Sequence, residues 1–386
     1  MTRTYSVISS DGHLEIPPDR WMTYVPERYR ERAPRLVSLP EGGQGWLVEG
    51  LPLIHNGSNI AAGRQMKIIG ASYWNADGTP APGTGGPRQR LREQDHDGVD
   101  AEVLFPPVFI GRFIENISDP AAYRALVRAY NEFLAAEYCA VAPDRLLATA
   151  LIPITGVADA VAELDHAKRL GLRAVCLSHF PNGSLLPSPD DDPFWERALE
   201  TDMPVTAHVT IGDRNHPMLL QSAAGRYEMP TTLLRGSVPP ALPMITQMIA
   251  SRVFDRIPDL RLYIAETNAG WLPEVLYMMD DSYRTFADVF DAPLKLLPTE
   301  YIQRHLYFGI VKDPVAIWSR DLLPVANLMW GSDFPHSASS YPDSRQFLDE
   351  TFAGLAELRR QILVETPCDF FRLDPNAPLT PTPDAV

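Results

Sequence analysis

The chain has 386 residues, with 49 aspartate and glutamate residues against 34 lysine and arginine residues, for a formal net charge of -15. This acidity argues against binding to nucleic acid or to an anionic membrane surface, because affinity for either depends on basic residues that neutralise phosphate. No basic stretch near the N-terminus precedes an apolar one, and no apolar run approaches the ~20 residues of a spanning helix, so we expect a soluble cytoplasmic protein.

Eight short runs rich in valine, isoleucine, leucine and alanine predict strands, and segments with helical period separate most of them. The expected strands are 5–10, 101–105, 146–151, 172–178, 204–208, 260–266, 306–309 and 328–332. The expected helices are 121–142, 157–170, 193–201, 241–256, 271–286, 314–323, 344–353 and 356–366. Because eight parallel strands with helical crossovers close into a barrel, the pattern predicts an α/β fold, a distorted (β/α)8 TIM barrel with C-terminal helices.

An open doubly wound sheet is the alternative, but no glycine-rich phosphate loop follows the first strand. We expect one domain over residues 1–373. Residues 35–92 follow the first strand without a long helical pattern and are predicted to form an insertion of short strands and loops. Residues 211–243 mix apolar side chains with prolines and are predicted to form a lid-like loop. Residues 374–386 are proline-rich and are expected to be extended or disordered.

Side chains that suit a metal ion lie at the carboxyl ends of several predicted strands, where barrels of this kind carry their reacting groups. They are Asp11 and His13 after the first strand, His179 after the fourth, His208 in the fifth, Glu266 in the sixth and Asp333 after the eighth. Imidazole and carboxylate groups are ligands of zinc, iron and manganese. We therefore expect one or two divalent metal ions at this end of the barrel, with a small-molecule substrate.

Seven short segments follow one another along the chain: DGHLEIPP at 11–18, GVDAEVLFP at 98–106, PDRL at 143–146, PVTAH at 204–208, FDRIPD at 254–259, GWLP at 270–273 after Glu266, and GSDFPH at 331–336. Together they resemble the amidohydrolase superfamily, specifically its amidohydrolase-related branch, which includes the aminocarboxymuconate-semialdehyde decarboxylase-like enzymes. The resemblance implies a distorted barrel with one or two divalent metal ions, in which Asp11, His13, His208 and Asp333 match the positions of metal ligands.

Two positions depart from the pattern of that branch. Many relatives open with two histidines where this chain has Asp11 and His13, so its first ligand pair is more negative and harder. In the decarboxylases the sixth strand usually ends in a histidine that acts on the substrate, whereas this chain has Glu266. A carboxylate there can ligate a second metal ion or accept a proton from water, and both roles favour hydrolysis.

The sequence therefore favours a metal-dependent hydrolase that uses an activated water on an ester, thioester, amide or activated carbon–carbon bond of an organic acid derivative with a hydrophobic body. Asp333 is the expected proton acceptor, while His179, His336 and Glu266 are candidates for orienting substrate or holding a second metal ion. Trp271 and Asn268, which follow the sixth strand, are expected to line the substrate pocket. Glu15 is expected to support a ligand or a neighbouring backbone group.

Two other functions stay open from the sequence. One is a metal-dependent, non-oxidative decarboxylase of an aromatic or unsaturated carboxylic acid, and a carbon dioxide assay separates it from hydrolysis. The other is an inactive barrel that serves as a binding module. An acidic barrel with apolar loops is also compatible with a homodimer.

Overall fold

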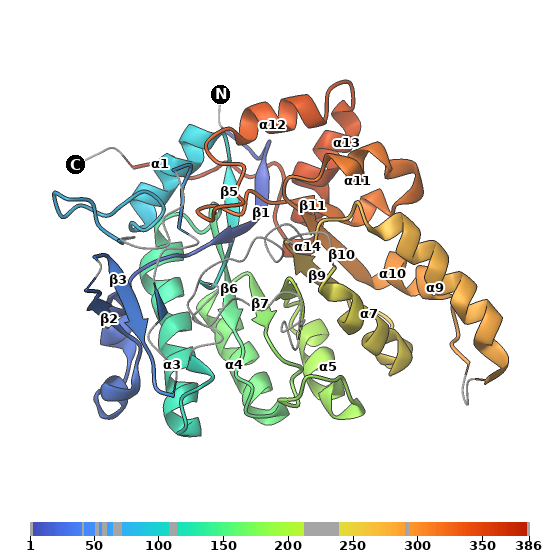
Figure 1. Cartoon of the computed structure of the whole chain (residues 1–386), viewed down its shortest axis with the longest axis horizontal. Coiled ribbons are helices and arrows are strands. Elements are labelled where there is room, and N and C mark those ends of the chain that lie inside the picture. Colours follow the sequence, from blue (N-terminus) through green and yellow to red (C-terminus); the bar gives the residue numbers. More distant parts are fainter. Residues whose placement is uncertain are drawn as a thin grey trace.

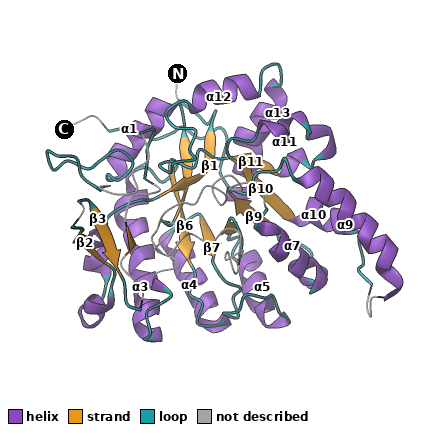
Figure 2. Ribbon diagram, viewed as in Figure 1, coloured by secondary structure: helices purple, strands orange, loops and turns teal. Residues whose placement is uncertain are grey.

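The computed structural model describes residues 3–40, 42–50, 54–55, 60–64, 72–107, 114–211, 239–289 and 293–383. Eight parallel strands form one sheet in the order β1-β5-β6-β7-β8-β9-β10-β11, and helices surround it (Figure 1, Figure 2). The strands are β1 (Ile8–His13), β5 (Ala101–Phe105), β6 (Leu146–Leu151), β7 (Ala174–Leu177), β8 (Val205–His208), β9 (Leu262–Ala265), β10 (Leu306–Ile310) and β11 (Leu328–Trp330). The predicted (β/α)8 barrel is confirmed.

Most of the strands are apolar runs because the barrel interior and the outer helices cover both of their faces. The exception is β1, which carries Ser9, Ser10 and Asp11 and is buried all the same. Seven of the eight strands are buried along their whole length. The exception is β10, in which Tyr307 is half-buried. The alternating pattern of a sheet with one solvated face is therefore missing from these strands.

The helices lie between and after the strands. They are α1 (Pro87–Asp97), α3 (Pro120–Phe133), α4 (Val157–Leu170), α5 (Asp192–Glu200), α7 (Ala241–Ala250), α8 (Val253–Arg256), α9 (Leu272–Phe286), α10 (Pro298–His305), α11 (Pro314–Trp318), α12 (Ser344–Thr351), α13 (Ala356–Arg360) and α14 (Thr366–Phe371). None of the described helices combines the length and the apolar character needed to cross a membrane.

Several elements differ from their predicted bounds. The predicted strand 5–10 starts later and runs to His13, so it carries Asp11 and His13 within it. The predicted helix 241–256 is divided into α7 and α8 at Arg252, whose φ of 60° is incompatible with a continuous right-handed helix. Two helices were not predicted at all, α1 and α10, and both begin with a proline in the first turn.

The insertion contains a small antiparallel sheet of β2 (Arg35–Ser38), β3 (Gln44–Leu47) and β4 (Ile54–His55), and then α1, which overlaps the end of the predicted insertion. The predicted lid-like loop at 211–243 lies almost entirely outside the described residues. The proline-rich tail is held against the start of the chain, since the backbone N–H of Leu379 donates to the Arg3 carbonyl over 3.0 Å and Leu379 is buried.

The barrel closes differently between β1 and β11 than between its other strands. In the described chain these two strands meet through an isolated bridge between Gly12 and Phe334, whereas the other neighbours form ladders. The His13 N–H donates to the Phe334 carbonyl over 2.7 Å, and the Asp333 N–H donates to the Asp11 carbonyl over 2.9 Å. Gly331 permits this approach, because a Cβ at that position would lie 2.3 Å from the Cβ of Asp11. We call this junction the seam.

Candidate metal centre

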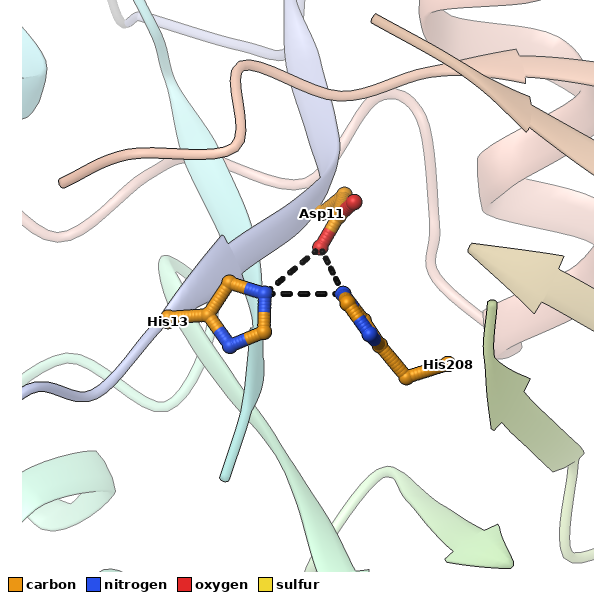
Figure 3. Close-up of side chains that lie close together, drawn as sticks. All are labelled: Asp11, His13 and His208. Carbon is orange, nitrogen blue, oxygen red and sulfur yellow. Dashed lines mark hydrogen bonds and ion pairs between the residues drawn. The ribbon is translucent and has the colours of Figure 1, made fainter. Parts of the chain in front are cut away.

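Three side chains from β1 and the end of β8 converge at the carboxyl end of the barrel (Figure 3). Asp11 and His13 come from β1, and His208 is the last residue of β8. All three are buried, with exposed fractions of 0%, 1% and 5% respectively. His208 lies 195 positions after His13 in the chain, and the barrel brings the two together.

The potential ligand atoms of this group face a common point. His13 Nε2 lies 2.8 Å from His208 Nε2, and Asp11 Oδ1 lies 3.6 Å from His13 Nε2 and 3.5 Å from His208 Nε2. Ligands bonded at ~2.1 Å to one tetrahedral or octahedral ion stand roughly 3.0–3.4 Å apart. The three distances lie on both sides of this range and within a few tenths of an ångström of it, so the group is close to the spacing of ligands around one cation.

The hydrogen bond on the far side of His13 prepares its ring for such a cation. His13 Nδ1 lies 2.9 Å from the carbonyl oxygen of Pro106, which can only accept, so Nδ1 carries the proton. The lone pair of Nε2 then points toward Asp11 and His208. Metal-ligating histidines usually donate their second ring nitrogen in this way.

Asp333 joins the group from the seam and is held by a second histidine. Its Oδ1 lies 3.5 Å from His13 Nε2 and 2.8 Å from His336 Nδ1. His336 Nε2 in turn lies 3.1 Å from Glu15 Oε1, and its ring stacks on that of His13 at 4.0 Å between centroids. His336 is thus placed between two buried carboxylates.

Burial and neighbouring charge shift the pKa values of Asp11, His13 and His336 away from their ordinary values. Burial, with the charge of Glu266 added, holds the pKa of Asp11 well above its ordinary value. Burial next to two other imidazoles holds the pKa of His13 well below its own. Burial also opposes charge on His336, but the negative charge of Asp333, and then that of Glu15, outweigh it and hold the pKa of His336 well above its usual range.

Three carboxylate oxygens of the group are buried without a hydrogen bond from the described residues. Both carboxylate oxygens of Asp11 and Oδ2 of Asp333 are fully buried, and the described part of the chain offers them no hydrogen-bond partner. Burying an unpaired carboxylate is costly, and a bound cation removes the cost. Two ligand groups fit that role, Asp11 with His13 and His208, and His13 with Asp333 and His336.

The backbone turns sharply where three of the strands end. Val209 after β8, Glu266 after β9 and Asp333 have φ values of 65°, 52° and 55°. Positive φ costs an ordinary residue free energy, and for a β-branched residue such as Val209 it is a pronounced outlier. Such strain persists where surrounding contacts impose it, and it gathers here at the mouth of the barrel.

Glu266 lies beside the ligand group. Its Oε2 lies 3.7 Å from His208 Nε2, and its side chain is 21% exposed, which distinguishes it from the enclosed Asp11 and Asp333. The turn that carries it is anchored on β10, because the N–H groups of Thr267 and Asn268 both donate to the Gly309 carbonyl, over 3.1 and 2.9 Å. Glu266 is therefore positioned by the backbone and accessible from the mouth.

The remaining predicted site residues have other contacts. His179, 22% exposed, lies with Nδ1 3.4 Å from Ser178 Oγ and 3.7 Å from Glu115 Oε1, so it is brought to this cluster and not to the two ligand groups. Asn268 Oδ1 accepts from the Val311 N–H over 3.1 Å. Trp271 donates from Nε1 to the Thr267 carbonyl over 2.9 Å. In these contacts Asn268 and Trp271 support the Glu266 turn.

A buried charged pair, Arg90 and Glu102, lies next to the candidate ligand His13 and was not predicted from the sequence. Arg90 of α1 and Glu102 of β5 are 1% and 2% exposed, and Arg90 Nε lies 2.7 Å from Glu102 Oε2. Glu102 sits inside an otherwise apolar strand, where a carboxylate needs a partner. That contrast was the available signal, but the helix that supplies the partner was not predicted.

The chain was compared with known families and structures. The model of the family described as amidohydrolase matches residues 71–373. No curated protein sequence matches the chain.

Solved structures share its fold at low sequence identity. An amidohydrolase from Mycobacterium avium subsp. paratuberculosis K-10 has a TM-score of 0.74 and 19% identity over 95% of this chain and 99% of that chain. The 5-carboxyvanillate decarboxylase of Sphingomonas paucimobilis has a TM-score of 0.62 and 20% identity over 75% and 84% of the two chains. A dihydroxybenzoic acid decarboxylase of Polaromonas sp. JS666, with bound manganese and the inhibitor 2-nitroresorcinol, has a TM-score of 0.61 and 17% identity over 95% and 96%.

Proposed function

The chain belongs to the amidohydrolase family, and from that premise we propose that it is a divalent-metal-dependent enzyme that releases carbon dioxide from an aromatic or unsaturated carboxylic acid without oxidation. Decarboxylases with the same fold, one of them with manganese bound, support this proposal. The observation that carries it is the buried group of Asp11, His13, His208 and Asp333. Three carboxylate oxygens of this group have no hydrogen-bond partner among the described residues. The hydrolase expected from sequence becomes the second candidate.

We assign the metal to Asp11, His13, His208 and Asp333. When bound, a manganese, zinc or iron ion supplies positive charge that binds and stabilises negatively charged oxygen atoms of the substrate. One ion is proposed, because the two ring nitrogens of His336 are already engaged by Asp333 and Glu15. The carboxylates of Asp11 and Asp333 favour a hard cation such as manganese.

Asp333 is the proposed proton carrier. In the reaction, the bond between the substrate carbon and its carboxylate breaks, the electron pair stays on that carbon, and a proton from Asp333 Oδ2 takes the place of the departing carbon dioxide. His336 holds Oδ1 of the same carboxyl group at 2.8 Å, which orients Oδ2. Asp333 then regains a proton from solvent.

Hydrolysis of an ester, thioester, amide or activated carbon–carbon bond remains the second candidate because of Glu266. Its carboxylate lies 3.7 Å from His208 Nε2 and is partly exposed, so it is placed to accept a proton from a water molecule at the mouth. A carboxylate at this position has no necessary part in moving the proton from Asp333.

One experiment separates the two candidates. The purified protein is loaded with Mn²⁺ and incubated with hydroxybenzoates and unsaturated dicarboxylates while released carbon dioxide is measured, and with aryl esters, thioesters and amides while the released acid is measured. His208→Ala, treated in the same way, is the control for background reaction. We expect carbon dioxide release by the unaltered protein alone. Release of acid without carbon dioxide would establish hydrolysis and overturn the decarboxylase.

A further inference from the structure

The seam next to the proposed metal centre depends on one buried arginine. Arg90 is 1% exposed, and its guanidinium donates four hydrogen bonds to three residues. Nη1 donates to the His13 carbonyl over 3.0 Å, and Nη2 donates to the Phe334 carbonyl over 3.0 Å. Nε and Nη2 also donate to the two oxygens of Glu102, over 2.7 and 2.9 Å. One side chain thus contacts both edges of the seam.

The two backbone carbonyls belong to segments that carry the proposed ligands. His13 is itself a ligand on β1, and Phe334 directly follows Asp333. Other described links between the two segments are the isolated bridge with its two backbone hydrogen bonds, the Ser332 N–H that donates to Ser9 Oγ over 2.9 Å, and His336 Nε2, which lies 3.1 Å from Glu15 Oε1. Because no ladder continues between β1 and β11 in the described chain, the relative position of the two ligand segments depends strongly on Arg90.

Three further features of the surroundings hold Arg90 and Glu102 in place. Its guanidinium carbon lies 4.4 Å from the centroid of the Phe334 ring, a cation–π contact. Gln94, one turn later on α1, donates to Glu102 Oε2 over 3.0 Å and holds the carboxylate from the other side. A Cβ on Gly12 would lie 2.4 Å from Glu102 Oε1 and 3.0 Å from Arg90 Nη2, so only glycine admits the pair between the two ligands of β1.

We propose that Arg90, fixed by Glu102, is a positioning residue that sets the spacing of Asp333 relative to Asp11 and His13 across the seam, and thereby sets the affinity of the metal centre. This inference rests on the proposed metal-dependent function and adds to it a residue that touches neither substrate nor metal. The fork geometry of arginine is essential to it. A lysine keeps the charge but cannot hold two carbonyls and a bidentate carboxylate at once.

The chain offers a matched control for this arginine. Arg145, at the opposite end of the barrel, is 0% exposed and also combines backbone and carboxylate contacts. It donates to the Asp100 carbonyl over 2.7 Å and to Asp95 Oδ1 over 2.8 Å. Its side chain reaches Gln94, whose Oε1 accepts from Arg145 over 3.3 Å, and its backbone carbonyl accepts from the Glu102 N–H over 2.9 Å, a backbone contact that Arg145→Lys keeps. Of these two arginines, only Arg90 contacts the seam, through the His13 and Phe334 carbonyls.

The test compares Arg90→Lys with Arg145→Lys by Mn²⁺ binding, followed through the electron paramagnetic resonance signal of free Mn²⁺, and by thermal unfolding of the metal-free proteins. We expect Arg90→Lys to bind Mn²⁺ about 10- to 100-fold more weakly than the unaltered protein, the loss typical of residues that orient ligands. Arg145→Lys is expected to lower the unfolding temperature with unchanged Mn²⁺ affinity. Equal Mn²⁺ affinity in Arg90→Lys and the unaltered protein overturns the inference and assigns Arg90 to stability alone.

A second variant covers the case in which Arg90→Lys does not fold. Glu102→Gln keeps the shape and leaves Arg90 with one fewer charged partner, and we expect Mn²⁺ affinity to fall by about 10-fold. Unchanged affinity in that variant also overturns the inference. If the unaltered protein binds Mn²⁺ but releases no carbon dioxide, the proposed function fails while the positioning role stands or falls on the variants. If it binds no Mn²⁺, the metal centre and this inference fail together.

Discussion

The two ends of the barrel differ in how their buried carboxylates are hydrogen-bonded. At the amino end, the Asp100 carboxylate accepts hydrogen bonds from the Ser6 and Val7 N–H groups, over 2.7 and 2.9 Å, and from Arg3 Nε over 2.6 Å. At the carboxyl end, both oxygens of the Asp11 carboxylate are buried and have no hydrogen-bond partner in the described chain. The same residue type is therefore satisfied at one end and left unsatisfied at the other.

This difference indicates that the carboxyl end of the barrel contributes less to the stability of the fold than the amino end. A buried carboxylate with several hydrogen bonds contributes to the folded state, whereas an unpaired one costs free energy unless a ligand neutralises it. Strained backbone adds to the cost at the carboxyl end, where Val209, Glu266 and Asp333 have positive φ values. The amino end thus supports the fold, and the carboxyl end is arranged for a cation and a substrate.

The largest effect on activity is expected from His208→Ala, at the carboxyl end. Removal of the imidazole takes away one of the ligand atoms around the common point, so Mn²⁺ affinity should fall by more than about 100-fold, the upper range for residues that only orient ligands. Activity should fall to background. Metal analysis and carbon dioxide release on one preparation check both effects. A variant with full metal content and turnover would show that the centre lies elsewhere.

Asp333→Asn is expected to reduce the rate by about 10²–10⁴-fold, because the amide cannot carry the proton that the proposed reaction needs. The amide oxygen can still face the cation, so Mn²⁺ binding should suffer less than in His208→Ala. Steady-state rates at saturating Mn²⁺, compared with a Mn²⁺ titration, separate the two effects. Near-normal turnover would move the proton to another residue.

Glu266→Gln is expected to lower decarboxylation by about 10-fold or less, because Glu266 has no part in the proposed proton transfer. The metal-to-protein ratio should stay the same if one ion is bound. A fall in that ratio would indicate that Glu266 holds a second ion. A loss of activity comparable to that of Asp333→Asn, with a changed acid limb of the pH–rate profile, would favour the hydrolase.

The smallest effect on activity is expected from Asp100→Asn, the matching change at the amino end. Rate and Mn²⁺ affinity should remain those of the unaltered protein. The free energy of unfolding should fall by about 1.5–3 kcal/mol, because hydrogen bonds to a charged acceptor are weakened. Urea denaturation measures this loss. A change in Mn²⁺ affinity here would contradict the division of roles between the two ends.

The sequence by itself indicated the barrel and most of the residues that we propose as metal ligands. Continuous apolar runs marked the strands, and polar residues at their carboxyl ends, such as Asp11, His208 and Asp333, stood out because a buried strand rarely ends in them without a reason. These are local features, so one chain segment at a time was enough to identify them.

Only the tertiary structure decided which of these residues meet. His179 follows a strand as His208 does, yet it pairs with Glu115 and Ser178, because the direction of a side chain at a strand end depends on the turn that follows. Arg90 and Glu102 show the same limit more clearly. Glu102 stands out in its apolar strand, but its partner cannot be identified from the sequence. The two become a buried pair only when α1 packs over the seam between the first and last strands, which are more than 300 residues apart.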